Sequence, residues 1–380
     1  MKKEMKTSFG MFSFFTGAGF LDLGFEKSGF RTIMANEIEP NFCRVYKYAR
    51  EKMKVPLPEV GLQEYDVGRF LENGDEAKLL RKSMRMAKQK YRMIGFVGGP
   101  PCPDFSVAGK NVGREGRHGK LSQIYADMIC EYRPDYFVFE NVKGLWRTAK
   151  HREFFDSIVK QFQKAGYAVT FRLINSLEYG VAQDRDRIIL VGVRKNYLHS
   201  VNYDKTTMML LEFPWERHIK YTREEIADIP WPTREDFNAE EINTKAKPEG
   251  VPEELTCEYW FRKNDVVNHP NANDFFVPRA GLVKMQTFDE GDDSRKCYKR
   301  LHRWRYSPTV AYGNNEVHLH PYKARRLSVA EALSLQSLPK AYQLPADVPL
   351  SFKFKTIGNG VPYLAAVGIA ETVRDFLEGL

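Results

Sequence analysis

The chain has 380 residues, 43% of them hydrophobic and 28% charged, with a formal net charge of +9. This composition excludes a disordered or fibrous protein, and no apolar stretch approaches the roughly eighteen residues that a membrane span needs. The five cysteines are scattered without a closely spaced pair, which argues against a zinc site and a disulfide framework. We therefore expect reduced thiols, no metal, a cytoplasmic location and, from the positive charge, a polyanionic partner.

The first half of the chain alternates apolar runs typical of strands with helical patterns. The expected strands are Phe12 to Phe15, Arg31 to Ala35, Met93 to Val97, Tyr136 to Phe139 and Arg187 to Val193. This alternation predicts an α/β fold for residues 1–197, with a mainly parallel sheet covered by helices on both faces.

The composition and the periodicity of the sequence change after about residue 198. Residues 198–324 carry many prolines among charged and aromatic residues, with little periodicity, which predicts a second, smaller and irregular domain. Helical patterns return at Ser328 to Leu338, where Ser328 could cap the helix, and at Tyr363 to Leu377. We expect residues 325–380 to form a hinge helix and to return to the first domain.

A glycine-rich turn follows the first strand. Phe15-Thr16-Gly17-Ala18-Gly19 joins a strand to a helix start and lets a ligand approach the backbone closely. A dinucleotide fingerprint needs a third glycine where Asp22 stands, so an NAD site fits poorly. Glu37 ends the next strand, where an acid could bind the ribose hydroxyls of an adenosine-containing cofactor. A plain tight turn is the alternative.

Cys102 follows a buried strand and a turn of glycines and prolines. Open α/β sheets carry their reactive groups at the carboxyl ends of strands, so the position is typical of a nucleophile. The alternative is a small buried hydrophobic residue, which is the usual role of a free cysteine.

Two charged motifs flank predicted strands, and the first lies at the carboxyl edge of the sheet where Cys102 is expected. Glu140 directly follows an apolar strand, where burial would raise its pKa and let it hold or deliver a proton. Arg185 and Arg187 precede another strand and could clamp a phosphate or a carbonyl oxygen. A helix-capping acid and a surface ion-pair ladder are the alternatives.

Residues 295–306 contain six cations and three aromatic residues and no acid. Such a segment suits a phosphate backbone. The basic run from Lys78 to Arg92 has helical spacing, which favours a solvated helix face.

Together these segments resemble the cytosine-C5 DNA methyltransferases in six ordered blocks. The blocks are Phe15 to Gly19, Glu37, Pro101-Cys102, Glu140-Asn141-Val142, Gln183-x-Arg185-x-Arg187, and Gly358 to Pro362. The resemblance implies the Rossmann-like fold of S-adenosylmethionine-dependent methyltransferases. It also implies a variable target-recognition region at about 198–305, closed by residues 307–310, and a packing helix that begins near Arg326.

The resemblance further implies the chemistry. Cys102 would add to C6 of cytosine, Glu140 would bind N3 and the exocyclic amine, and Arg185 and Arg187 would fix O2 and a nearby phosphate. The methyl group would come from S-adenosylmethionine, leaving S-adenosylhomocysteine. The cytosine would be flipped out of double-stranded DNA, because a stacked base cannot reach such a pocket.

The resemblance also implies binding residues. For the cofactor these are Phe15, Gly17, Gly19, Glu37, Asp66, Pro101, Asn359 and Val361. For DNA they are Ser106, Lys110, Lys299, Arg300, Arg303, Arg305 and Thr309. Residues 106–120 resemble the loop that closes over DNA in this family, with Gly109, Gly113, Gly116 and Gly119 as hinges; a surface loop without that role is the alternative.

Phe20 and Pro103 depart from the commonest family pattern, which puts cofactor affinity and loop geometry in doubt but removes no reacting group. The compact size resembles a prokaryotic, nucleoid-associated modification enzyme that works as a monomer and protects DNA from a paired nuclease. One alternative is a tRNA cytosine-C5 methyltransferase, whose Cys-Phe-Thr tripeptide is absent here. The other is a catalytically silent DNA-binding relative, which would need no thiol at Cys102.

Overall fold

The computed structural model describes residues 9–101, 117–238, 246–277, 282–295, 297–310, 312 and 317–380. A sheet of nine strands in the order β3-β2-β1-β4-β5-β7-β6-β9-β8 forms its centre. The strands are β1 (Phe9–Phe14), β2 (Arg31–Asn36), β3 (Leu62–Gln63), β4 (Met93–Gly98), β5 (Tyr136–Val142), β6 (Tyr167–Asn175), β7 (Asp186–Arg194), β8 (Tyr203–Asp204) and β9 (Met209–Leu210).

Strands β3, β2, β1, β4 and β5 are parallel, whereas β7 runs antiparallel to β5 and β6 antiparallel to β7. The expected α/β class and mainly parallel sheet are confirmed. The reversal of β7 has a functional consequence, because it brings the start of β7 to the edge where β1, β2, β4 and β5 end. The register makes this explicit by pairing Val142 with Arg187.

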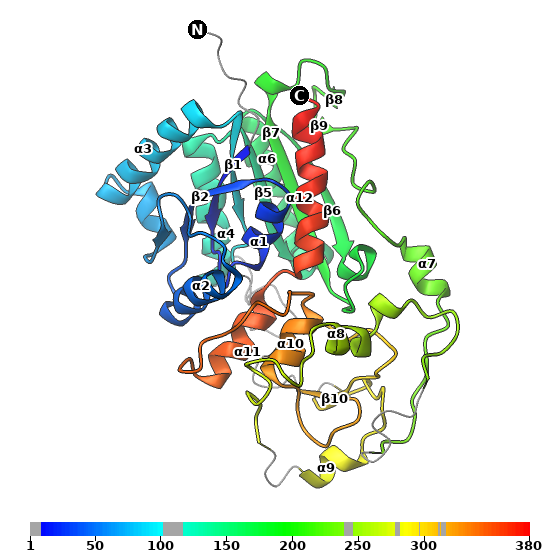
Figure 1. Ribbon diagram of the computed structural model, residues 1–380. Helices are drawn as coiled ribbons and strands as arrows, with labels where there is room; N and C mark the ends of the chain where they lie inside the picture. The colour runs from blue at the N-terminus through cyan, green and yellow to red at the C-terminus, as the bar shows by residue number, and fades with distance from the viewer. Residues whose placement is uncertain are drawn as a thin grey trace.

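Helices cover both faces of the sheet (Figure 1). One face packs against α1 (Phe20–Lys27) and α12 (Tyr363–Glu378). The other packs against α3 (Asp75–Lys90), α4 (Arg117–Tyr132) and α6 (Ala149–Lys164). The buried strands are apolar on both faces, as sheets covered on both sides require.

The remaining helices are shorter or lie off the sheet. They are α2 (Pro40–Met53), α5 (Gly144–Arg147), α7 (Arg223–Asp228), α8 (Cys257–Lys263), α9 (Leu282–Thr287), α10 (Val329–Leu335) and α11 (Leu350–Asn359). The 3₁₀ turns are η1 (Val67–Leu71), η3 (Ser176–Tyr179), η4 (Lys195–Tyr197) and η5 (Glu253–Leu255), and the strands β10 (Lys299–Arg300) and β11 (His318–Leu319) form a separate pair.

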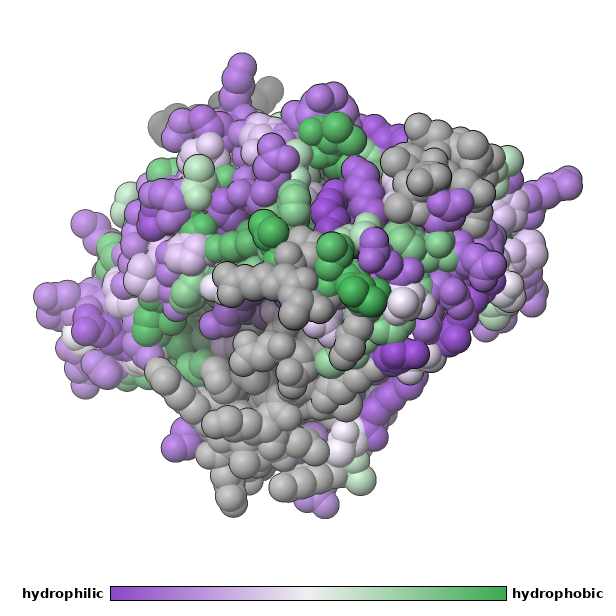
Figure 2. All heavy atoms as spheres, turned by 90° about the horizontal axis from the view of Figure 1, so that it is seen from below, coloured by the Kyte–Doolittle hydropathy of each residue, from purple (hydrophilic) through white to green (hydrophobic). Residues whose placement is uncertain are grey.

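The segments from α7 to α11 form a second lobe beside the carboxyl edge of the sheet (Figure 1). Much of this lobe between α7 and α10 is irregular, in keeping with its prolines. Seen from below, its described surface is largely hydrophilic with isolated hydrophobic spots (Figure 2). The domain boundaries at residues 198 and 324 stay a prediction.

The helix expected at Ser328 to Leu338 forms over Val329–Leu335, and its role as a hinge stays a prediction. Ser328 accepts a hydrogen bond from the Glu331 N–H, and the Glu331 carboxylate accepts one from the Ser328 N–H, which completes a capping box at the start of α10. The last helix, α12, occupies residues 363–378, close to the expected range.

Candidate active site at the carboxyl edge of the sheet

The glycine-rich turn after β1 adopts a left-handed backbone at three residues. Phe15, Gly17 and Gly19 have φ values of 55°, 55° and 80°. A Cβ on Gly17 would meet no atom within 4 Å, whereas one on Gly19 would lie 2.7 Å from the Tyr46 ring. The turn therefore needs glycine at position 19 for packing and leaves open space above position 17, where a ligand can approach the backbone.

Glu37 lies against this turn from the end of β2. Its carboxylate accepts hydrogen bonds from the backbone N–H groups of Gly17, Ile38 and Glu39 at 2.9, 2.9 and 2.8 Å. Burial raises the pKa of Glu37, and the hydrogen bonds from Glu39 and Gly17 oppose that shift. A buried carboxylate beside an open glycine turn suits a ligand that carries hydroxyl donors, such as a ribose.

Asp22 holds the turn from beneath. Its carboxylate accepts hydrogen bonds from the hydroxyl groups of Ser13, Thr16 and Tyr46 at 2.5, 2.6 and 3.1 Å. In the sequence Asp22 stands where a dinucleotide fingerprint needs a glycine, and its supporting role was not predicted. The nearby hydroxyls of Ser13 and Thr16 were the available signal for this supporting role.

The C-terminal block reaches the same turn. A Cβ on Gly360 would lie 2.1 Å from the Phe20 ring, so the backbone beside Asn359 and Val361 packs directly on the start of α1. Asn359 is exposed and Val361 buried. The structure thus brings the Gly358 to Pro362 block next to the glycine turn, and its contact with a cofactor stays a prediction.

Asp66 lies near the end of β2 but has a local role. The Asn36 side chain donates to the carbonyls of Gln63 and Tyr65 at 3.0 and 2.9 Å, which ties this segment to β2. The Asp66 carboxylate accepts from the Gly68 N–H at 2.7 Å and caps η1. Its exposed side chain leaves its cofactor role a prediction.

Glu140 and Arg187 form a buried ion pair where β5 and β7 meet. Arg187 Nε lies 2.9 Å from Glu140 Oε1, and Glu140 is 8% exposed. Burial raises the pKa of Glu140, and the positive charges of Arg187 and Arg185 oppose the rise. The pair combines a proton-holding carboxyl group with a guanidinium that fixes its orientation.

The segment that leads to Cys102 lies against Glu140. A Cβ on Gly99 would lie 2.4 Å from Glu140 Oε2, and the Asn141 amide donates to the Pro100 carbonyl at 3.4 Å. Pro101 is half-buried and is the last residue before a gap in the described chain. Cys102, Ser106 and Lys110 lie outside the described residues, as does most of the expected loop at 106–120, whose end forms the first turn of α4.

Arg185 differs from Arg187 in its surroundings. It is 1% exposed, and its guanidinium donates to the backbone carbonyls of Val310 and Gly358 at 2.9 and 2.8 Å. These contacts join the sheet edge to the expected closing element and to the C-terminal block. A direct contact between Arg185 and a substrate stays a prediction.

Two of the arginines expected to contact DNA are structural, which corrects that expectation. Arg300 is fully buried and donates to the carbonyls of Met285, Phe288, His320 and Lys323. Arg303 forms a buried ion pair with Glu290, with nitrogen to oxygen distances of 2.8 Å. Net charge and sequence spacing gave no sign that these cations bind groups inside their own lobe.

The other basic candidates remain accessible. Lys299 and Arg305 are half-buried, and Arg305 lies 3.9 Å from Asp293. The Thr309 hydroxyl donates to the Asp184 carbonyl at 2.6 Å. Their contact with DNA stays a prediction.

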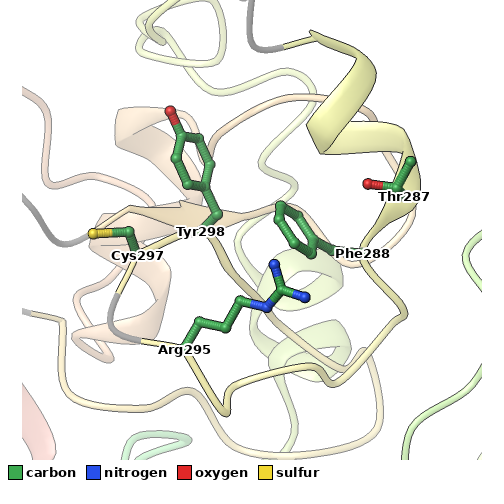
Figure 3. A pocket seen from close by; sticks show the side chains of 5 residues that line it. All are labelled: Thr287, Phe288, Arg295, Cys297 and Tyr298. Carbon is green, nitrogen blue, oxygen red and sulfur yellow. The ribbon is translucent and has the colours of Figure 1, made fainter.

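A separate pocket of about 390 Å³ lies in the second lobe (Figure 3). It is lined by Thr287, Phe288, Arg295, Cys297 and Tyr298. The exposed Arg295 guanidinium lies 4.5 Å from the centre of the Phe288 ring, and Tyr298 has a left-handed φ of 60°. This pocket shares no residue with the cluster at the sheet edge.

Within the described ranges, no helix is long and apolar enough to cross a membrane. Nor do the described side chains include a cluster of three His, Cys, Asp or Glu residues that could hold a metal ion.

Comparison with known proteins agrees with this geometry. A family profile described as C-5 cytosine-specific DNA methylase matches residues 9–375. The chain is 52% identical over 378 residues to the type II methyltransferase M.NmeDI of Neisseria meningitidis serogroup C, across 100% of this chain and 86% of that protein. It is 29% identical to M.FnuDI of Fusobacterium nucleatum, across 96% and 95%.

Two solved structures share the fold. A putative DNA modification methyltransferase encoded in an E. coli prophage superposes with a TM-score of 0.64 at 19% identity, across 97% of this chain and 99% of that one. The methyltransferase EhMeth of Entamoeba histolytica superposes with a TM-score of 0.57 at 11% identity, across 98% and 99%.

Proposed function

Because the chain belongs to the family of C-5 cytosine-specific DNA methylases, we propose that it methylates C5 of a cytosine flipped out of a specific duplex sequence, through a transient bond to Cys102. One observation carries the proposal above the others. The buried Glu140–Arg187 pair lies at the sheet edge, and Gly99, two residues before Pro101, packs against its carboxylate.

The nucleophile comes first in the proposed reaction. C5 of cytosine is too poor a nucleophile to accept a methyl group unaided. The Cys102 thiolate forms a bond to C6, and the electron pair of the C5–C6 double bond moves into the ring towards N3. Glu140 donates its proton to N3, so that no negative charge accumulates on the base.

S-adenosylmethionine supplies the methyl group when it is bound. C5, now electron-rich, takes the methyl group. A base then removes the C5 proton, the C5–C6 double bond re-forms, the Cys102 thiolate leaves, and N3 returns its proton to Glu140. Throughout these steps Arg187 holds the Glu140 carboxyl group, and in the proposed mechanism it donates to O2 of the base.

The described residues fit this cofactor. The space above Gly17 can accept the amino-acid end, and the Glu37 carboxylate can accept hydrogen bonds from the ribose hydroxyls. Phe15, Gly19, Asp66, Pro101, Asn359 and Val361 complete the set of residues that we propose to hold it. The Asp22 carboxylate keeps the turn in shape for binding.

The DNA must open to deliver its base. Flipping a cytosine costs roughly a few kcal/mol, which contacts from the second lobe must offset. Lys299, Arg305 and Thr309 are the described candidates for those contacts, together with Ser106 and Lys110. We propose that residues 198–324 form the target-recognition domain and that one chain is sufficient for activity.

The type II relatives support a place in restriction and modification. We propose that the enzyme acts in the cytoplasm of a prokaryotic host, where it protects DNA from a paired nuclease. The description of the matching family profile also favours DNA over tRNA as substrate.

Methylation-sensitive sequencing of DNA from an expressing host tests the proposal. We expect 5-methylcytosine at one position of one short sequence, and none in a host that expresses a Cys102→Ser variant. Bisulfite sequencing of tRNA from the same cells checks the alternative substrate. Unmodified DNA in cells that contain the folded wild-type protein would contradict the proposal.

A further inference from the structure

Arg185 lies at a buried junction of four chain segments. Its Nη1 donates to the carbonyl of Val310, and its Nη2 donates to the carbonyl of Gly358. Its own carbonyl accepts hydrogen bonds from the N–H and the hydroxyl of Ser176, at 3.0 and 3.2 Å. The Arg185 backbone is therefore held by Ser176, and its guanidinium holds the segments at Val310 and Gly358.

Gln183 connects the same segments from the other side. Its Oε1 accepts from the Val310 N–H at 3.1 Å, and its Nε2 donates to the carbonyl of Leu335 at 3.0 Å, at the end of α10. Gln336, the next residue, donates to the carbonyl of Ile357 at 2.6 Å. The junction thus links the entry to β7, the segment before residue 310, and the ends of α10 and α11.

Of the two carbonyls that Arg185 binds, one lies beside the proposed cofactor site and the other beside the second lobe. Gly358 immediately precedes Asn359, and Gly360 in the same block packs on Phe20 at the start of α1, next to the glycine turn. Val310 ends the segment that closes the second lobe, where the Ser307 N–H also donates to the Ala182 carbonyl at 2.9 Å. A displacement of either segment changes the hydrogen bonds available to the other.

We infer that Arg185 is a positioning residue that couples occupancy of the cofactor site to the placement of the target-recognition lobe. The inference rests on the proposed function for the identity of the two sites. Packed hydrogen-bonded networks carry coupling between two sites when both sites contact the same bonded unit. Arg185 is that shared unit, since one guanidinium binds both carbonyls.

Hydrogen exchange with S-adenosylhomocysteine as the probe tests this inference without DNA. The Ser307 and Val310 amides donate across the junction. In the wild-type protein we expect saturating S-adenosylhomocysteine to slow exchange of a peptide spanning 305–310 at least about tenfold. In an Arg185→Lys variant, which keeps the charge but cannot bind both carbonyls, we expect little or no slowing.

Arg172→Lys is the matched control. Arg172 also donates to a backbone carbonyl, that of Trp215 at 3.1 Å, and pairs with Glu178, but it contacts neither Val310 nor Gly358. This control should retain the wild-type response. Gln183→Met removes the acceptor for the Val310 amide and for a 3.5 Å hydrogen bond from Arg185 Nη1. It should lose the response and serves if Arg185→Lys does not fold.

A thermal shift measured in parallel separates two kinds of failure. If S-adenosylhomocysteine does not raise the melting temperature of the wild type, the proposed cofactor site is wrong and the coupling falls with it. If it does raise that temperature but the 305–310 peptide responds equally in wild type and Arg185→Lys, the coupling alone is wrong.

A kinetic comparison adds a second criterion: Arg185→Lys should raise KM for both substrates, whereas Arg187→Lys should mainly lower kcat.

Discussion

Burial of one carboxyl group governs the proton chemistry at the sheet edge. Glu140 is nearly inaccessible, and its burial raises its pKa although Arg187 lies 2.9 Å away. The protonated form that donates to N3 is populated below this raised pKa and is lost as pH rises through it. Cys102 has the opposite requirement, because its reactive thiolate forms as pH rises.

We therefore predict a bell-shaped dependence of methylation rate on pH, with the alkaline fall set by Glu140. A Glu140→Gln variant should lose that fall and react roughly 10²- to 10⁴-fold more slowly, the range typical of general acid catalysis. Single-turnover methylation of a substrate duplex across pH measures both effects. Glu178→Gln, at a buried carboxylate paired with Arg172, is the control; an unchanged rate in Glu140→Gln would refute the role.

The sequence predicted which residues belong to this site better than it predicted the contacts that each of them makes. The sequence placed Glu140 after one strand and Arg187 at the start of another, without predicting that the two strands are neighbours. The structure has both residues inside strands, β5 and β7, which pair with each other. The sequence could not distinguish Arg187 from Arg185, two positions away, because their difference lies in contacts with residues 310 and 358 that are remote in the chain. Arg300 and Arg303 are a second example, because the sequence did not predict that remote groups of the same lobe bury them.

At the scale of elements, the left-handed turn between β1 and α1 is the part most open to test. Gly17 has a φ of 55° and free space above it, whereas Gly29, between α1 and β2, has a φ of 94° and equally free space. Alanine at either position should cost about 1 kcal/mol or somewhat more in stability, because both need a left-handed backbone. Only position 17 faces the proposed ligand.

We predict that Gly17→Ala weakens S-adenosylhomocysteine binding at least about tenfold, which is about 1.4 kcal/mol. Gly29→Ala should leave the dissociation constant unchanged despite a similar loss of stability. Isothermal titration calorimetry with chemical unfolding of both variants measures the two quantities. Equal affinities in the two variants would show that the space above Gly17 is not a binding site.

The positions of most long strands were predictable from the sequence, whereas the direction of β7 was not. The apolar runs identified β1, β2, β4, β5 and β7 to within a few residues. Strand β6 was missed, because its outer half carries Arg172 and partly exposed residues that break the apolar pattern. The antiparallel direction of β7 depends on tertiary pairing that no local signal encodes.

At the scale of the whole molecule, the net charge of +9 predicts DNA binding that weakens with salt. Lys299→Ala and Arg305→Ala should each weaken binding uniformly across sequences. Each should also reduce the slope of log K against log salt by about one. Fluorescence anisotropy over a salt series measures this, and an unchanged slope in both variants would remove these residues from the interface.

Unlike the Lys299 and Arg305 variants, Arg303→Ala should lower stability, because the buried negative charge of Glu290 would lose its positive partner. We predict a loss of about 3–5 kcal/mol in the free energy of unfolding. The salt slope of the variant, measured where it is folded, should stay that of the wild type. A stable variant with a reduced slope would restore the original expectation that Arg303 contacts phosphate.

The account as a whole depends on the bond between Cys102 and C6 of the base, and trapping that bond tests it most directly. A duplex with 5-fluorocytosine at the modified position cannot release the enzyme, because fluorine replaces the proton that a base must remove. Incubated with S-adenosylmethionine, the wild type should give a covalent adduct that survives a denaturing gel, and Cys102→Ser should give none. An adduct that persists in Cys102→Ser, or a wild type that methylates ordinary DNA yet forms no adduct with this duplex, would contradict the mechanism.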